Sequence, residues 1–92
     1  MTVEILRSDT AALPAAERAA ELLASSGETL SLACTDGEMK SAYTVLRTVM
    51  DHGYAHDSPA LVRLVCADEA VYKTYRFQWN MWYAERKPDE EE

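Results

Sequence analysis

Three stretches of the chain repeat one order of apolar and polar positions. They span residues 3–9, 30–36 and 62–68, and in each an apolar run is followed by a small residue and then by an aspartate. Apolar runs of this length predict buried β-strands, and an aspartate just after a strand is typical of the start of a helix. The pattern therefore predicts three strand–helix units in succession.

Helical spacing follows the first two predicted strands. The first helix is predicted from about Ala12 to Ser26, with Pro14 in its first turn and Gly27 just past its end. The second is predicted from about residue 38 to residue 52, where Gly53 ends it. Its predicted apolar face, spaced by three and four residues, consists of Met39, Ala42, Tyr43, Leu46, Val49 and Met50.

The segment from residue 68 to residue 86 carries two competing periods. Apolar and polar residues alternate from Tyr75 to Tyr83, as in a strand, but the same segment also places its aromatic residues on one helical stripe. Acids at its start, and Arg86 and Lys87 before Pro88 at its end, favour a helix. The strand reading stays open as the alternative.

The helical reading predicts a single α/β domain over residues 1–87 with the order βαβαβα and a mostly parallel three-stranded sheet. Three helices are expected to cover one face of the sheet and part of the other. The strand reading would instead give a βαβαββ two-layer sandwich. Residues 88–92 are expected to form a disordered acidic tail.

The distribution of charge and apolar residues along the chain argues against several classes of function. The formal net charge is −7, but Asp89 to Glu92 supply four of the negative charges and the rest of the chain is nearly balanced. Without a basic stripe, a nucleic-acid-binding platform is not expected. The apolar runs are too short for membrane insertion, and the first residues lack the basic region of a signal peptide. These features predict a cytoplasmic protein.

The third unit resembles a known family. Residues 64–73 resemble the closing strand and helix of STAS domains, and residues 15–26, 27–32 and 41–46 are similar to earlier elements of that family in the same order. STAS domains include bacterial anti-sigma factor antagonists and the small cytoplasmic subunit of lipid-transport ABC complexes. The resemblance implies a non-catalytic regulatory domain whose protein partner is an anti-sigma kinase or an ABC ATPase subunit.

The resemblance also implies a site at the start of the second helix. Aligned on Val45 and Leu46, the chain places Ser41 at one of the family's hydroxyl positions, with Met39 or Lys40 where the family has aspartate. Ser41 is therefore the candidate phosphorylation site, and Lys40 is placed to pair with a phosphate. The expected partner interface comprises Thr35, Asp36, Gly37, Glu38, Lys40, Ser41, Thr44 and Arg47.

A second resemblance is to the sulfur-carrier family. Residues 27–30 followed by Asp36 are similar to that family, and in this register its sulfur-carrying cysteine falls on Thr10. Because carrier chemistry needs sulfur there, this reading implies the fold without the activity. It also requires residues 61–80 to form a β-hairpin.

Candidate chemistry is sparse, and no enzyme is predicted because no catalytic constellation or glycine-rich phosphate loop is present. Asp9, Asp36 and Asp68 are expected to cap helices, with a Mg²⁺ site at the strand ends as the alternative. No cofactor and no metal are predicted.

The two cysteines have a structural and a functional interpretation, and so do the two histidines. Cys34 and Cys66 are expected to be reduced, buried thiols that lie close together if their strands are neighbours, with a redox role as the alternative. His52 and His56 are expected to compensate charge at a helix end, with metal binding or pH sensing as the alternative.

Aromatic residues gather near the end of the chain. A domain of this size cannot bury all of them, and Phe77 and Met81 fall on a second stripe away from the first. Phe77, Met81 and Trp82 are therefore the expected secondary apolar contact. The alternative function from this feature is a small phage or host regulator that forms a homodimer through its last helix. The six aromatics are Tyr72, Tyr75, Phe77, Trp79, Trp82 and Tyr83.

Overall fold

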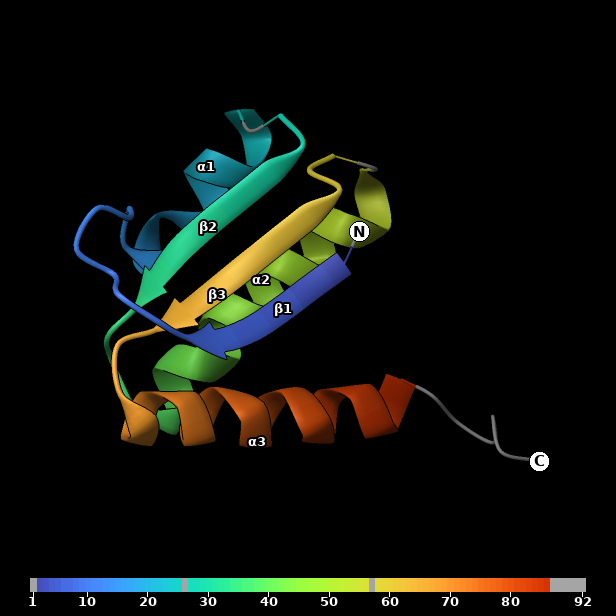
Figure 1. Ribbon diagram of the computed structural model, residues 1–92. Helices are drawn as coiled ribbons and strands as arrows, with labels where there is room; N and C mark the ends of the chain where they lie inside the picture. Colours follow the sequence, from blue (N-terminus) through green and yellow to red (C-terminus); the bar gives the residue numbers. More distant parts are fainter. Residues whose placement is uncertain (1, 26, 57, 87–92) are drawn as a thin grey trace.

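A computed structural model describes residues 2–25, 27–56 and 58–86, with the backbone alone for 82–86. Within these residues, strands and helices alternate along the chain (Figure 1). The predicted acidic tail lies outside the described residues. The elements are β1 (Thr2–Arg7), the 3-10 helix η1 (Ala16–Arg18), α1 (Ala19–Ser25), β2 (Thr29–Cys34), α2 (Met39–Ala55), β3 (Leu61–Cys66) and α3 (Glu69–Arg86).

The described strands form one parallel sheet in the order β1-β3-β2, which confirms the predicted parallel sheet. β3 lies in the middle because it is the most apolar strand, and it buries Val62, Leu64 and Val65 on its two faces. On the face away from the helices, Arg63 donates from Nε to Oε1 of its neighbour Glu4 at 3.2 Å.

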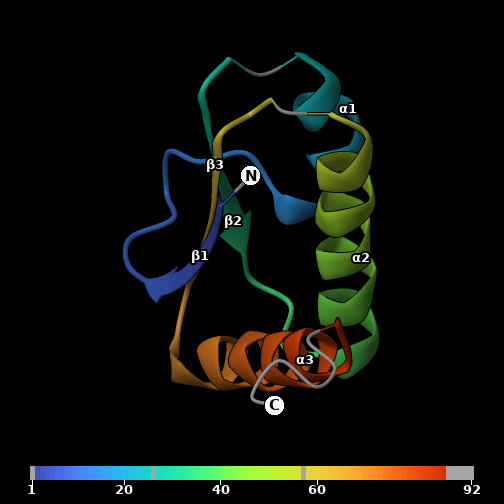
Figure 2. The same ribbon diagram turned by 90° about the vertical axis from the view of Figure 1, so that its right-hand side faces the viewer.

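α1 and α2 both cover the same face of the sheet (Figure 2). α2 buries Ala42, Leu46 and Val49 against the sheet, as its spacing predicts. Met39 and Tyr43, which were also expected on this apolar face, are exposed instead. One helix can bury only part of its surface against a narrow sheet, and the apolar face predicted for α2 is wider than that part. Met39 and Tyr43 therefore lie at the margin of the buried face.

The opposite face is crossed by the loop of residues 8–15, which passes over the ends of β3 and β2 (Figures 1 and 2). The prediction of helix from Ala12 is therefore wrong, because Pro14 accepts a hydrogen bond from the Ala33 N–H at 2.7 Å and Ala15 pairs with Ala33. The prediction that helices cover part of this face is also wrong.

α3 lies across the carboxyl ends of the strands and beneath the start of α2 (Figures 1 and 2). Asp68 caps it by accepting a hydrogen bond from the Val71 N–H at 3.0 Å, and Val71 and Tyr75 are buried. The predicted helix is confirmed. The hairpin over residues 61–80, and with it the βαβαββ alternative, is wrong.

α2 continues past its predicted end. No described glycine has a positive φ, and helical backbone runs through Gly53 to Ala55. The His56 N–H then bonds the carbonyl of His52 at 2.9 Å. A glycine ends a helix only where the chain needs a left-handed residue, and this turn does not.

Candidate functional site

The loop between β2 and α2 is fastened to the helix by one carboxylate. Oδ1 of Asp36 accepts a hydrogen bond from the Glu38 N–H at 2.9 Å, and Oδ2 accepts one from the Ser41 hydroxyl at 2.6 Å. The hydrogen bond from Ser41, followed by that from Glu38, lowers the pKa of Asp36 below its ordinary value. An ionised carboxylate therefore sets the position of the Ser41 side chain.

The first turn of α2 contains no acidic residue. The N-cap of the helix is Glu38, whose side chain makes no capping hydrogen bond within the described residues. Lys40 and Ser41 lie in this turn, where backbone N–H groups and the helix dipole favour an anion.

α3 supports the loop from the carboxyl edge of the sheet. The Thr74 hydroxyl donates to the carbonyl of Gly37 at 3.0 Å. The α-carbon of Gly37 faces Val71, whose Cγ2 would lie 3.7 Å from an added β-carbon. The loop is thus held between its own helix and α3.

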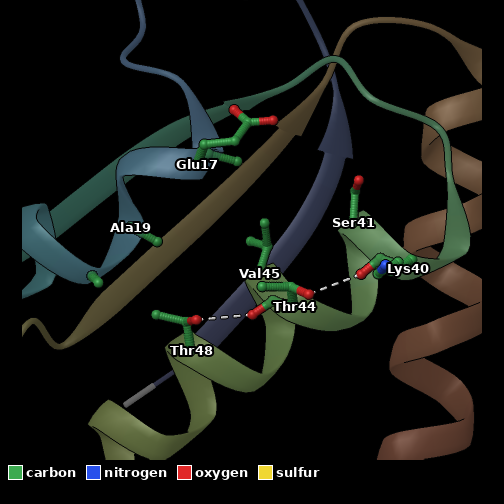
Figure 3. A pocket seen from close by; sticks show the side chains of 9 residues that line it. Glu17, Ala19, Lys40, Ser41, Thr44, Val45 and Thr48 are labelled. Atoms are coloured by element: carbon green, nitrogen blue, oxygen red, sulfur yellow. Dashed lines mark hydrogen bonds between the residues drawn. The ribbon is translucent and has the colours of Figure 1, made fainter.

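A pocket of about 280 Å³ opens between the η1–α1 segment and α2, beside Ser41 (Figure 3). Glu17 lies on one side of it and Ser41 on the other. The hydroxyls of Thr44 and Thr48 donate to backbone carbonyls one turn earlier, at 3.0 and 2.9 Å. The pocket is lined by Ala16, Glu17, Ala19, Ala20, Lys40, Ser41, Thr44, Val45 and Thr48.

The structure brings the expected interface residues together, with the exception of Arg47. Lys40, Ser41 and Thr44 line the pocket, while residues 35–38 form the loop beside it. Arg47 does not line the pocket and forms an ion pair with Asp51 at 3.5 Å.

Sequence reasoning missed two parts of the pocket. Thr48 lies one turn after Thr44, so helical spacing could have found it. Glu17 and the alanines of residues 16–20 could not be found in this way, because a tertiary contact alone brings them to α2.

Cys34 and Cys66 are register neighbours on β2 and β3, as expected for adjacent strands, and both are buried and free of disulfide bonds. Hydrogen bonding to the Cys66 thiol, together with burial, raises the pKa of Cys34 above its ordinary value. Burial, followed by the neighbouring Cys34, raises the pKa of Tyr75. The protonated Cys34 thiol is a poor nucleophile, whereas the interaction with Cys34 lowers the pKa of the Cys66 thiol, which is fully buried.

The remaining candidates do not form a metal centre. Within the described residues, no group of three or more His, Cys, Asp or Glu could hold a metal ion. Asp9 accepts a hydrogen bond from the Ala11 N–H at 3.0 Å and caps no helix. The rings of His52 and His56 stack with centroids 4.4 Å apart, and Nε2 of His52 hydrogen bonds with the Ser58 carbonyl at 2.8 Å.

The secondary apolar contact predicted on α3 is placed in part. Phe77 and Met81 are exposed, as expected for a second stripe. The side chain of Trp82 lies outside the described residues.

No protein-family model, curated protein or solved structure matches the chain significantly. The STAS resemblance therefore stays a prediction. None of the helices described is long and apolar enough to cross a bilayer.

Proposed function

We propose that this chain is a non-catalytic protein-interaction domain that binds its partner through the β2–α2 loop and the start of α2, and that phosphorylation of Ser41 switches the binding. The observation that carries the proposal is the hydrogen bond from Ser41 to Asp36, because it makes the shape of the loop depend on the state of one hydroxyl. The interface comprises Thr35, Asp36, Gly37, Glu38, Lys40, Ser41, Thr44 and Arg47.

A phosphate on Ser41 changes the local charge balance in two ways. It replaces the donated proton with a group of about −1.5 to −2 charge, which repels the Asp36 carboxylate now 2.6 Å away. It also meets the N–H groups of the first turn of α2 and the ammonium of Lys40. The phosphate thus takes the place of Asp36 at the helix end, and the loop of residues 35–38 loses its hydrogen bond to Ser41 while it keeps the one from Thr74.

By resemblance to STAS domains, the partner is an anti-sigma kinase or an ABC ATPase subunit, and the setting is the bacterial cytoplasm. A kinase partner would transfer the γ-phosphoryl group of a nucleoside triphosphate to Oγ of Ser41, with release of the nucleoside diphosphate and of the hydroxyl proton. The exposed surroundings of the site support access by a protein: Thr35, Gly37, Glu38 and Lys40 are all exposed.

The test compares three full-length variants as affinity baits in an extract of the native host. Ser41→Glu places a negative charge against Asp36, and Ser41→Ala removes the hydrogen bond without adding charge. Ser8→Glu, at the exposed residue that follows β1, adds the same charge outside the β2–α2 loop and α2. A partner captured by wild type and by Ser8→Glu is expected to be lost with Ser41→Glu and to be bound more weakly by Ser41→Ala.

Two results contradict the proposal. Equal capture by all of the variants removes the loop from the interface. Incubation of the captured kinase with the chain and nucleoside triphosphate should label Ser41 by mass spectrometry, and labelling confined to another residue removes the switch.

A further inference from the structure

A set of exposed apolar side chains lies on α2 and on α3. We call it the apolar strip, and it consists of Met39 and Tyr43 on α2 with Phe77 and Met81 on α3, which are 44%, 42%, 50% and 48% exposed. Each pair is spaced by four residues and so lies on one side of its helix. Gln78 joins the two helices, because its Nε2 lies 3.5 Å from Sδ of Met39.

Three basic side chains and one exposed acid, Glu38, border the apolar strip. Arg47 lies one turn beyond Tyr43, Lys73 lies one turn before Phe77, and Lys40 lies beside Met39. The first two form exposed ion pairs within their own helices, Arg47 with Asp51 at 3.5 Å and Lys73 with Glu69 at 4.0 Å. Such pairs contribute little and exchange readily. Lys40 makes no ion pair with any residue that the structure describes.

The size and composition of the strip are those of an interface centre. Side chains of this kind bury about 150–250 Å² each, so four of them at half exposure present roughly 400 Å² of apolar area. One partner of a standard interface buries about 800 Å² in total, with an apolar centre and a polar rim. Aromatic residues, methionine and arginine are the types enriched at such centres.

We propose that the apolar strip binds an acidic amphipathic segment of a partner protein. Its apolar side chains would cover Met39, Tyr43, Phe77 and Met81, and its carboxylates would meet Lys40, Arg47 and Lys73. Charge complementarity selects this occupant over a second copy of the chain, because a second copy would bring the same basic border against the first. The inference rests on the proposed function, since the strip continues the same surface from the first turn of α2 onto α3.

The test titrates the ¹⁵N-labelled full-length chain with two synthetic amphipathic peptides that share one apolar face. The polar face of the first carries glutamate and that of the second carries lysine. The glutamate peptide is expected to shift the amide signals of residues 39–47 and 73–81 and to bind at least about tenfold more tightly than the lysine peptide at low salt. Phe77→Ser and Met81→Ser are each expected to weaken it by roughly fivefold or more.

Matched variants separate the strip from the rest of the surface. Tyr54→Ser removes an apolar side chain that is 59% exposed near the other end of α2, and should leave the affinity unchanged. The triple variant Lys40→Glu, Arg47→Glu and Lys73→Glu should reverse the preference, so that the lysine peptide binds more tightly. All of these positions are exposed, and far-ultraviolet circular dichroism is to be measured on each variant as a check that it is folded.

Several outcomes overturn the proposal. These are equal affinity for the two peptides, shifts confined to other residues, or a dimer in analytical ultracentrifugation that Phe77→Ser dissociates. A further variant neutralises the acidic residues 89–92: Asp89→Asn, Glu90→Gln, Glu91→Gln and Glu92→Gln. The amide signals of the apolar strip should not change in this variant. A change would mean that residues 89–92 of the chain itself occupy the strip, and it would overturn the proposal. If Ser41→Glu abolishes capture of the native partner but the strip variants do not, the proposed function stands and this inference falls.

Discussion

Tyr75 offers the sharpest physical test of how α3 is held to the sheet. Its side chain is 1% exposed, and burial, followed by the neighbouring Cys34 thiol at the carboxyl end of β2, raises the pKa of its phenol. Tyr75→Phe keeps the ring and removes the hydroxyl that interacts with Cys34. A buried polar interaction of this kind is worth about 1 kcal/mol, so at pH 8 we expect the free energy of unfolding to fall by about that amount.

The same substitution should have a different effect at high pH. Burial raises the pKa of Tyr75 in the folded chain above its ordinary value of 10.0. Above pH 10 the unfolded chain releases this proton while the folded chain keeps it, so the wild-type free energy of unfolding falls as pH rises. At pH 11 this linkage removes about 1.4 kcal/mol from the wild type and nothing from Tyr75→Phe. The difference between the two proteins should therefore vanish or reverse.

Urea unfolding measured by circular dichroism at pH 8 and pH 11, in the presence of a reductant, checks this prediction. Titrating groups away from Tyr75 are common to both proteins and cancel in the difference, and the Cys34 thiol, whose pKa is raised by Cys66 and by burial, stays protonated in both folded proteins. Tyr54→Phe, at a tyrosine 59% exposed, controls for loss of a phenol at the surface. A penalty for Tyr75→Phe that is equal at the two pH values would refute the buried, protonated phenol.

Three further predictions concern packing, backbone and the loop. Leu46→Ala, at a side chain 1% exposed, should cost about 2–5 kcal/mol in urea unfolding. Gly27→Ala should add about 0.4–1 kcal/mol, because no atom lies within 4 Å of the added β-carbon, φ is not positive and the unfolded chain loses freedom. A decrease in stability would contradict the backbone conformation that the structure gives Gly27. Ser41→Ala should raise the pKa of Asp36 towards its ordinary 3.8, measured by carboxyl ¹³C titration, and an unchanged pKa would contradict the hydrogen bond.

The sequence predicted the elements whose signals are local. Each apolar run became a strand, and the acids at the start of residues 68–86 indicated a helix that Asp68 does cap. The neighbouring thiols of Cys34 and Cys66 followed once their strands were taken as adjacent.

The errors arose where a distant contact decides the local structure. Pro14 is a good first-turn residue, but pairing with Ala33 on β2 holds that stretch extended and delays the helix. Helical spacing alone could not show that Met39 would lie outside the core, because this depends on how α2 and α3 meet. Glu17 reaches the pocket for the same kind of reason.

Amide hydrogen–deuterium exchange on the full-length chain, alone and with its captured partner, tests the central claim most directly. We expect the partner to slow exchange over residues 35–47 of the wild type and to leave that segment unprotected in Ser41→Glu. Slowed exchange confined to residues 8–15 and 27–33, with residues 35–47 unchanged, would place the partner on the other side of the molecule and contradict the proposed interface.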